Sequence, residues 1–77
     1  MSAIKSEALA LQDLAIKREL SRDADMIKMA LSMALRNSEV LFHKIEANRG
    51  YTRDCYRLDD LQQDIQNLID EMEKLEL

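Results

Sequence analysis

The stretch Asn48-Arg49-Gly50-Tyr51-Thr52 decides the fold, because it holds the single glycine of a 77-residue chain that has no proline. Gly50 can take the left-handed conformation just past a helix end, and Arg49 suits the negative end of a helix dipole. Thr52 is a favourable N-cap for a following helix. About three connecting residues between two long helices force those helices to lie antiparallel and adjacent. The pattern therefore predicts a helical hairpin.

Composition places the whole chain in the all-α class. Leu, Met and Ala supply most of its apolar residues, whereas strand-forming aromatics are limited to one Phe and two Tyr. We expect a single helical domain over residues 1–77, with helices at about 3–20, 24–48 and 53–75. A core this small supplies only roughly 3–5 kcal/mol by itself, so the chain is expected to associate with itself or with another protein.

The boundary between the first two expected helices lies at Ser21-Arg22-Asp23-Ala24-Asp25. Ser21 and Asp23 are good N-cap residues, but the stretch contains neither Gly nor Pro. It can be a corner, a kink or no break at all. We expect a short corner that sets an additional N-terminal helix apart from the two-helix hairpin.

Several function classes have no support in the sequence. Basic residues form no stripe, and residues 51–77 hold eight acidic and three basic side chains, so nucleic acid is not an expected partner. No apolar run approaches the ~20 residues that span a bilayer, and no secretory signal is visible. Cys55 is the single cysteine, which excludes an internal disulfide. We expect a soluble, cytoplasmic protein.

Catalytic and metal-binding patterns are also missing from the sequence. No Ser-His-Asp set or glycine-rich phosphate loop occurs. Glu39 and His43 share helical spacing, but a metal site would need a second histidine or clustered cysteines. Cys55 lies at the start of the third expected helix and is taken as inert. We expect no enzyme activity, no metal and no cofactor.

Two apolar seams of heptad spacing predict how the long helices pair. The third expected helix carries Leu58, Leu61, Ile65, Leu68, Met72 and Leu75. The second carries Ile27, Leu31, Ala34, Ser38, Leu41 and Ile45, with Leu35 and Phe42 widening this seam on one side. Both follow the a/d pattern of a coiled coil. Each seam could face a partner, but we expect mainly that the two pack against each other.

The second expected helix has more apolar surface than one hairpin mate can cover. A further set of residues lies about 120° around the helix from its seam, namely Met26, Met29, Ala30, Met33 and Val40. The N-terminal helix could fold back over this set, or another protein could bind it. Methionine side chains adapt well to binding surfaces. Both possibilities remain open.

The hairpin corner also carries a resemblance to a known family. Arg49-Gly50, then five residues, then Tyr56, followed by a Gln/Asp-rich amphipathic helix, resembles the small cochaperones of type III secretion needle subunits. The resemblance covers roughly residues 37–72 and implies a hairpin that pairs with a larger helical-repeat chaperone. Together such proteins hold the needle subunit as a monomer in the bacterial cytoplasm. The N-terminal segment is longer here than in that family.

The resemblance implies that Tyr56 anchors the corner, and that apolar hairpin residues face the other chaperone. Our hypothesis is a non-enzymatic cochaperone or assembly adaptor that stabilises a larger helical chaperone or secretion-apparatus subunit. The alternative is a self-contained homodimeric helical bundle with a regulatory or structural role. The candidate partner-binding residues are Met26, Met29, Met33, Val40, Leu58, Leu61 and Ile65. The candidate corner residues are Arg49, Gly50 and Tyr56.

Overall fold

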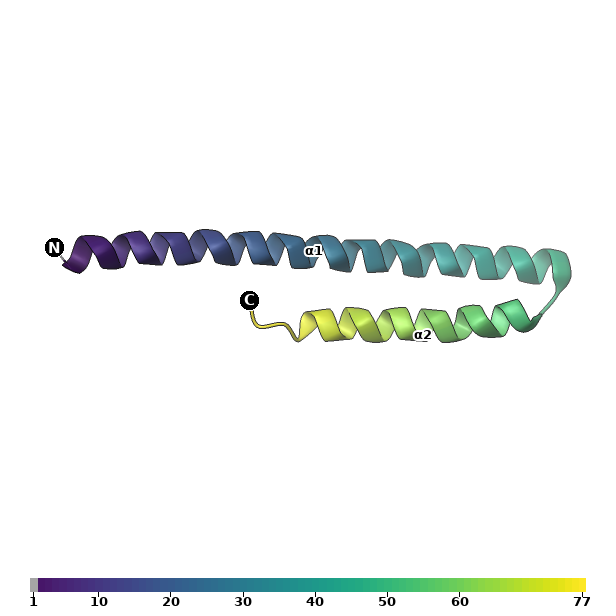
Figure 1. Ribbon diagram of the computed structural model, residues 1–77. Helices are drawn as coiled ribbons and strands as arrows, with labels where there is room; N and C mark the ends of the chain where they lie inside the picture. Colours follow the sequence, from purple (N-terminus) through teal and green to yellow (C-terminus); the bar gives the residue numbers. More distant parts are fainter. Residues whose placement is uncertain (1) are drawn as a thin grey trace.

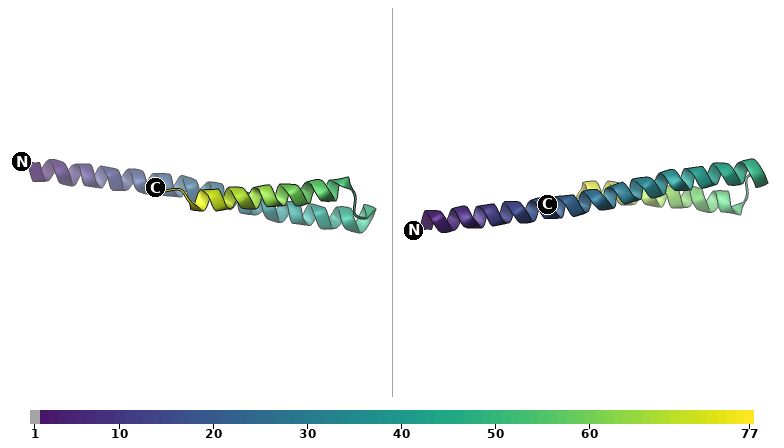
Figure 2. Two further views of the ribbon diagram at one scale, coloured as in Figure 1. Left: turned by 90° about the horizontal axis from the view of Figure 1, so that it is seen from below. Right: turned by 90° about the horizontal axis from the view of Figure 1, so that it is seen from above.

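Two helices joined by a short turn make up the fold (Figure 1). The computed structural model describes the backbone of residues 2–77 and the side chains from Leu9 onward. Helix α1 spans Ser2–Arg49, and helix α2 spans Arg53–Glu73. Helix α2 runs antiparallel beside the C-terminal part of α1, as Figures 1 and 2 show from three directions. The predicted all-α class and antiparallel hairpin are confirmed.

The turn forms where the lone glycine predicts it. Gly50 has a φ of 78°, the left-handed region that a residue with a side chain adopts at a cost. Its N–H donates to the Glu46 carbonyl oxygen at 3.0 Å and so closes the last turn of α1. Thr52 is the N-cap of α2 and is extended, but its hydroxyl makes no capping hydrogen bond. Its carbonyl oxygen accepts from the N–H groups of Cys55 and Tyr56.

The expected corner at residues 21–25 is wrong, because α1 runs through it without a break. The predicted helices 3–20 and 24–48 are therefore one helix, and residues 2–49, as the structure describes them, contain no separate N-terminal helix. Ser and Asp cost up to about 0.7 kcal/mol each inside a helix, less than the roughly 1 kcal/mol of Gly and far less than the roughly 3 kcal/mol of Pro. An ion pair across one turn, Lys28 Nζ to Asp25 Oδ1 at 3.3 Å, adds local support. N-cap residues without a true helix breaker are not sufficient to end a helix.

The helices differ greatly in length, and the difference sets the shape of the molecule. Helix α1 has 48 residues and α2 has 21, so α2 reaches only as far as about Ala24 on α1. The remainder of α1, residues 2–23, continues past the end of α2 and is here called the overhang (Figures 1 and 2). The radius of gyration is 20.3 Å, against about 11.5 Å for a compact domain of this length.

The helices meet along one narrow seam with heptad spacing. On α1 the least exposed side chains in the paired region are those of Ala24, Lys28, Leu31, Leu35, Ser38, Phe42 and Ile45. On α2 they are those of Cys55, Leu58, Gln62, Ile65, Ile69 and Met72. Both sets alternate steps of three and four residues, as in a coiled coil. Ser38 is buried within the seam and satisfies its hydroxyl by donating to the Leu35 carbonyl oxygen at 2.7 Å.

This seam is rotated on both helices from the one that the sequence predicts. Ile27, Ala34 and Leu41 of α1 are exposed, as are Leu61 and Leu68 of α2 and Leu75 beyond the end of α2. The turn accounts for the shift, because so short a connection presses the first turn of α2 onto the end of α1. Cys55 becomes fully buried there, with its Sγ 3.8 Å from the Gly50 carbonyl oxygen. Steps of seven residues from Cys55 lead to Gln62 and Ile69. Ile69 therefore lies in the seam and Leu68 does not.

The C-terminal end of α2 also differs slightly from the prediction. The helix ends at Glu73, not near residue 75, and Lys74 is its C-cap. Its last turn holds no basic residue, so nothing there complements the negative end of the dipole. Lys74 instead pairs with Glu71, with Nζ 3.0 Å from Oε1.

The register of the seam predicts opposite effects for two adjacent residues of α2. Ile69→Ala should lower the free energy of unfolding by about 1–2 kcal/mol, because Ile69 is half-buried between the helices. Leu68→Ala should change it by less than about 0.5 kcal/mol, since the Leu68 side chain is 52% exposed. Urea denaturation at low protein concentration measures both. A larger loss for Leu68→Ala than for Ile69→Ala would contradict the observed register.

Candidate protein-interaction faces

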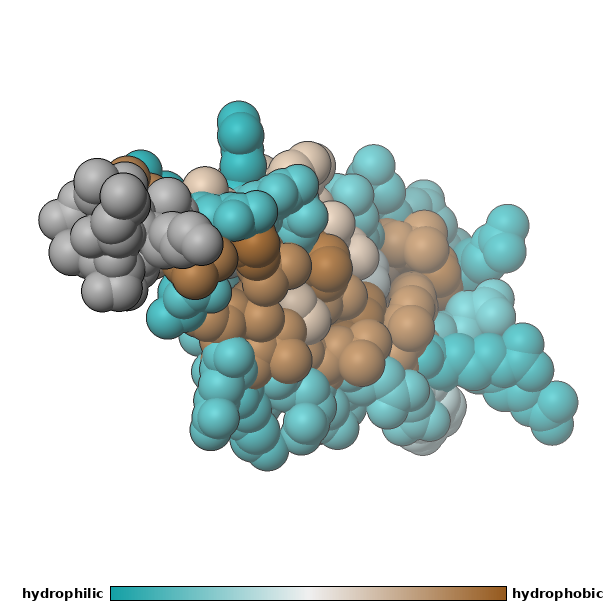
Figure 3. All heavy atoms as spheres, turned by 60° about the vertical axis from the view of Figure 1, so that its left-hand side comes forward, coloured by the Kyte–Doolittle hydropathy of each residue, from teal (hydrophilic) through white to brown (hydrophobic). Residues whose placement is uncertain are grey.

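Most of the apolar surface of this hairpin lies outside the seam. The accessible surface is 6602 Å² for a chain of 8.9 kDa. A compact monomer of that mass exposes about 4,800 Å². The excess is roughly 1,800 Å², comparable to the area that a standard protein–protein interface buries in total. Figure 3 shows apolar side chains gathered in a continuous band with polar side chains on either side.

The first apolar face is on α1 and is here called the methionine stripe: Met26, Met29, Met33 and Val40. Their side chains are 64%, 66%, 60% and 47% exposed, respectively. At ~100° per residue the stripe lies about 180° from the seam of α1, so it points directly away from α2. The overhang continues along the axis of α1 and does not fold back over it. Within the described part of the chain, the stripe therefore has no cover.

Basic side chains border the methionine stripe. A shallow depression beside Met26 and Met29 is also lined by three basic side chains, those of Lys17, Arg18 and Arg22, and by one acidic side chain, that of Asp25. A second depression lies between Met29 and Met33, with Ser32 and Arg36 in its wall. The stripe is thus an apolar strip with a positive border, although the whole chain carries a net charge of −4.

The second apolar face combines both helices and is here called the leucine flank: Ile27, Ala34 and Leu41 of α1 with Leu61 and Leu68 of α2. All five are exposed, and the four large ones are 46–52% accessible. Each residue directly precedes a residue of the seam and so occupies the g position of a coiled coil. In an antiparallel pair the g positions of both helices lie on the same side of the seam. The leucine flank is therefore one surface.

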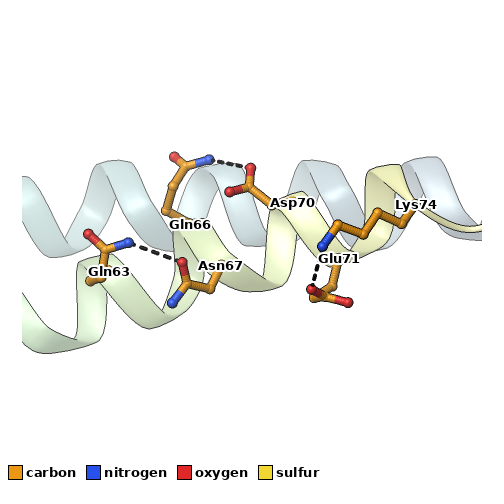
Figure 4. A network of polar contacts seen from close by, with 6 residues as sticks. All are labelled: Gln63, Gln66, Asn67, Asp70, Glu71 and Lys74. Carbon is orange, nitrogen blue, oxygen red and sulfur yellow. Dashed lines mark hydrogen bonds and ion pairs between the residues drawn. The ribbon is translucent and has the colours of Figure 1, made fainter.

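The opposite flank of the seam is polar, which makes the hairpin two-sided. There Lys28 Nζ bridges the helices to Glu73 Oε1 at 3.6 Å, near the end of α2. The outer face of α2 is polar as well, and its side chains pair with one another (Figure 4). Gln63 donates to Asn67 at 3.0 Å, and Gln66 donates to Asp70 at 3.2 Å. Polar side chains that make their hydrogen bonds within one helix are typical of a solvated surface.

The predicted partner-binding residues divide between the surface and the seam. Met26, Met29, Met33, Val40 and Leu61 are exposed and available to another molecule. Ile65 is buried and Leu58 is half-buried between α1 and α2, so these two residues pack within the chain. The sequence analysis did not single out Leu68 as a partner-binding residue. Its spacing of seven residues from Leu61 was the signal that joins it to the leucine flank.

Aromatic rings cluster at the turn. The ring of Tyr51 lies 4.8 Å from that of Tyr56 and 5.8 Å from that of Phe42, both edge-to-face. Tyr56 itself is 61% exposed, so it lies over the corner at its surface. The fully buried residue there is Cys55, which the sequence analysis treated as inert and did not place in the corner.

Among the residues with described side chains, no group of three His, Cys, Asp or Glu is arranged to hold a metal ion. His43 is exposed, and its ring lies 5.6 Å from that of Phe42. In the same part of the chain, neither helix has the combination of length and apolar character that crossing a membrane requires.

Tyr51 has a perturbed pKa that can be tested directly. Its hydroxyl donates to Asp59 Oδ2 at 2.7 Å, and this bond, with desolvation and the nearby negative charge, raises the pKa of Tyr51 to about 12. The ordinary value is about 10. A raised pKa means that the bond stabilises the fold below pH ~10, and that this contribution is lost as the pH rises through about 12.

In a Tyr56→Phe background, the tyrosinate absorbance of Tyr51 should therefore titrate with a midpoint near 12. Asp59→Asn in the same background should move the midpoint down toward ~10. Circular dichroism at each pH shows whether the helices persist. Equal midpoints with and without Asp59 would rule out the hydrogen bond.

Comparisons with known proteins identified no relative of this chain. No family model, no curated protein and no solved structure matches the chain. Its interaction faces are therefore interpreted from their own geometry and chemistry.

Proposed function

We propose that this protein is a non-enzymatic interaction module, a cochaperone or assembly adaptor that binds a larger helical protein through the methionine stripe. The observation that carries the proposal is the exposure of Met26, Met29 and Met33 at 60–66% on the side of α1 that points away from α2. Leaving so many large apolar side chains in water is unfavourable for a lone chain. A bound partner removes that cost.

The hairpin supports this role mechanically. Residues 24–49 of α1 are backed by α2 along the seam, so the stripe is presented on a helix that is already formed. Binding then costs little ordering entropy. Unbranched thioethers adapt to the contours of a partner without a change of backbone. The geometry suits a helix of the partner that lies along α1.

The charged residues beside the methionine stripe indicate which kind of partner surface would bind there. Arg18, Arg22 and Arg36 line the depressions beside the stripe, so the complementary surface is an apolar helical face bordered by acidic side chains. The outer face of α2, with its internally paired side chains, is not part of this surface.

The resemblance to needle-subunit cochaperones supports the same class of partner, a larger helical-repeat chaperone in the bacterial cytoplasm. Under that reading Leu61 is accessible to the chaperone only while the leucine flank is uncovered, and the methionine stripe is the main contact. Ile65 and Leu58 support the binding surface from within the seam and do not contact the partner. Tyr56 covers the corner beside Tyr51.

The proposal predicts that Met33→Asp abolishes partner binding without unfolding the chain. Because Met33 is exposed, its replacement should change the free energy of unfolding by less than about 0.5 kcal/mol. Burying an unpaired carboxylate in the complex should weaken binding by roughly a hundredfold or more. Met33→Leu is the matched control, since it keeps an apolar side chain of similar size at the same position.

The measurement has two steps. Tagged wild-type, Met33→Asp and Met33→Leu chains are used for capture from the native host, and a protein retained by the first and third but lost by the second is identified. That protein is then co-expressed, and its affinity for each variant is measured by calorimetry. Equal affinity for all three variants, or unfolding of Met33→Asp, would refute binding through the stripe.

A further inference from the structure

The overhang is a second apolar element without a neighbour in its own chain. Its side chains Leu9, Ile16 and Leu20 are 66%, 47% and 44% exposed. In the described part of the molecule, α2 ends before it reaches them (Figure 1). A helix of this length gains little stability from propensity alone in water and usually depends on packing of its apolar face.

The overhang and the leucine flank share one face of α1. At ~100° per residue, Leu9, Ile16 and Leu20 fall in the same sector, about 60° wide, as Ile27, Ala34 and Leu41. The two parts also match in length. Leu9 to Leu20 spans roughly 17 Å of helix, and Ile27 to Leu41 spans roughly 21 Å.

The overhang cannot cover the leucine flank of its own chain. A helix of 48 residues should extend about 72 Å, and the longest dimension of the molecule is 72 Å. Helix α1 is therefore close to straight, and its two halves point in opposite directions from residue 24. An overhang can reach a leucine flank only when that flank belongs to another molecule.

We infer that a second copy of this chain covers the leucine flank, in a symmetric antiparallel dimer in which each overhang lies on the flank of the other copy. In the register that puts Leu9 opposite Leu41 of the second copy, Ile16 lies opposite Ala34 of the second copy. A large side chain thus meets a small one at this position. Two-fold symmetry makes both contacts twice.

Charge favours the overhang as the occupant of the flank. Helix α2 carries seven acidic and two basic side chains, a net charge of −5. A dimer that paired α2 with α2 would bring two such helices together at an electrostatic cost. Residues 9–23 hold three acidic and three basic side chains, so the overhang is neutral. The antiparallel arrangement also leaves the two α2 helices at opposite ends of the dimer.

The available area suits this arrangement. A standard interface buries ~800 Å² on each partner, and each chain exposes roughly 1,800 Å² more than a compact monomer of its mass. Covering the flank and the overhang still leaves the methionine stripe free, because the stripe lies about 110° from the flank around α1. The dimer is thus independent of the proposed partner, and each copy offers one stripe.

The test begins with sedimentation equilibrium of the full chain. The wild type should form a dimer of twice 8.9 kDa. Ile16→Asp should raise its dissociation constant by roughly a hundredfold or more, because each dimer would bury two carboxylates. Leu11→Asp is the matched control: Leu11 is 68% exposed in the same overhang but about 140° from Ile16 around the helix. It should leave the dimer intact.

Neither substitution lies in the hairpin, so both variants should remain helical by circular dichroism. A wild type that stays monomeric would overturn the inference, and so would equal effects of the two substitutions. Met33→Asp separates the two proposals, because it should abolish partner binding and leave the dimer unchanged. Loss of the dimer in Met33→Asp would place the self-contact on the stripe and contradict the inferred geometry.

Orientation is tested by disulfide formation between variants that each carry one introduced cysteine. Cys55 is fully buried and should not react in the folded chain. Mixed Leu9→Cys and Leu41→Cys chains should form a mixed disulfide faster than either forms one with itself. Preferential linkage of Leu9→Cys to itself indicates a parallel dimer and would overturn the antiparallel arrangement.

Discussion

Two helices alone can bury only one line of contact, and this limit governs the whole molecule. Each helix presents a single narrow face to the other, so every apolar residue outside the seam stays in water. Among the side chains that the structure describes, three apolar ones are buried, those of Ala24, Cys55 and Ile65. The sequence nevertheless has an apolar fraction of 47%. Stability and function thus depend on what covers the remaining surface.

The turn sets which residues enter that line of contact. Because Gly50 closes α1 in a left-handed conformation and α2 begins at Arg53, the first turn of α2 is held against the last turn of α1. Cys55 is buried as a result, and the heptad pattern that follows leaves Leu61 and Leu68 outside the seam. A small buried residue at the corner thereby determines the composition of the leucine flank.

The sequence alone was sufficient for the class, the turn and the antiparallel pairing, because one glycine in a chain without proline is an unambiguous signal. It was not sufficient for the continuity of α1. Ser21 and Asp23 are good N-caps, but they are also tolerated inside a helix, and only tertiary contacts distinguish the two cases. The register of the seam was missed for a related reason. Leu61 and Gln62 are neighbours, and hydrophobicity alone favours Leu61 as the seam residue. The geometry of the turn instead places Gln62 in the seam. The methionine stripe was recognised from its spacing, and its freedom from cover follows from the straightness of α1.

The central claim is that the methionine stripe remains in water in the isolated chain, and oxidation by dilute peroxide tests it most directly. Methionine oxidises readily where its sulfur is accessible. Mass spectrometry of the purified protein, folded and in denaturant, gives the rate for each site. The account predicts that Met26, Met29 and Met33 oxidise nearly as fast in the folded chain as in the unfolded one, while Met72, half-buried in the seam, is several-fold slower. Protection of all three stripe residues to the same degree as Met72 would contradict it.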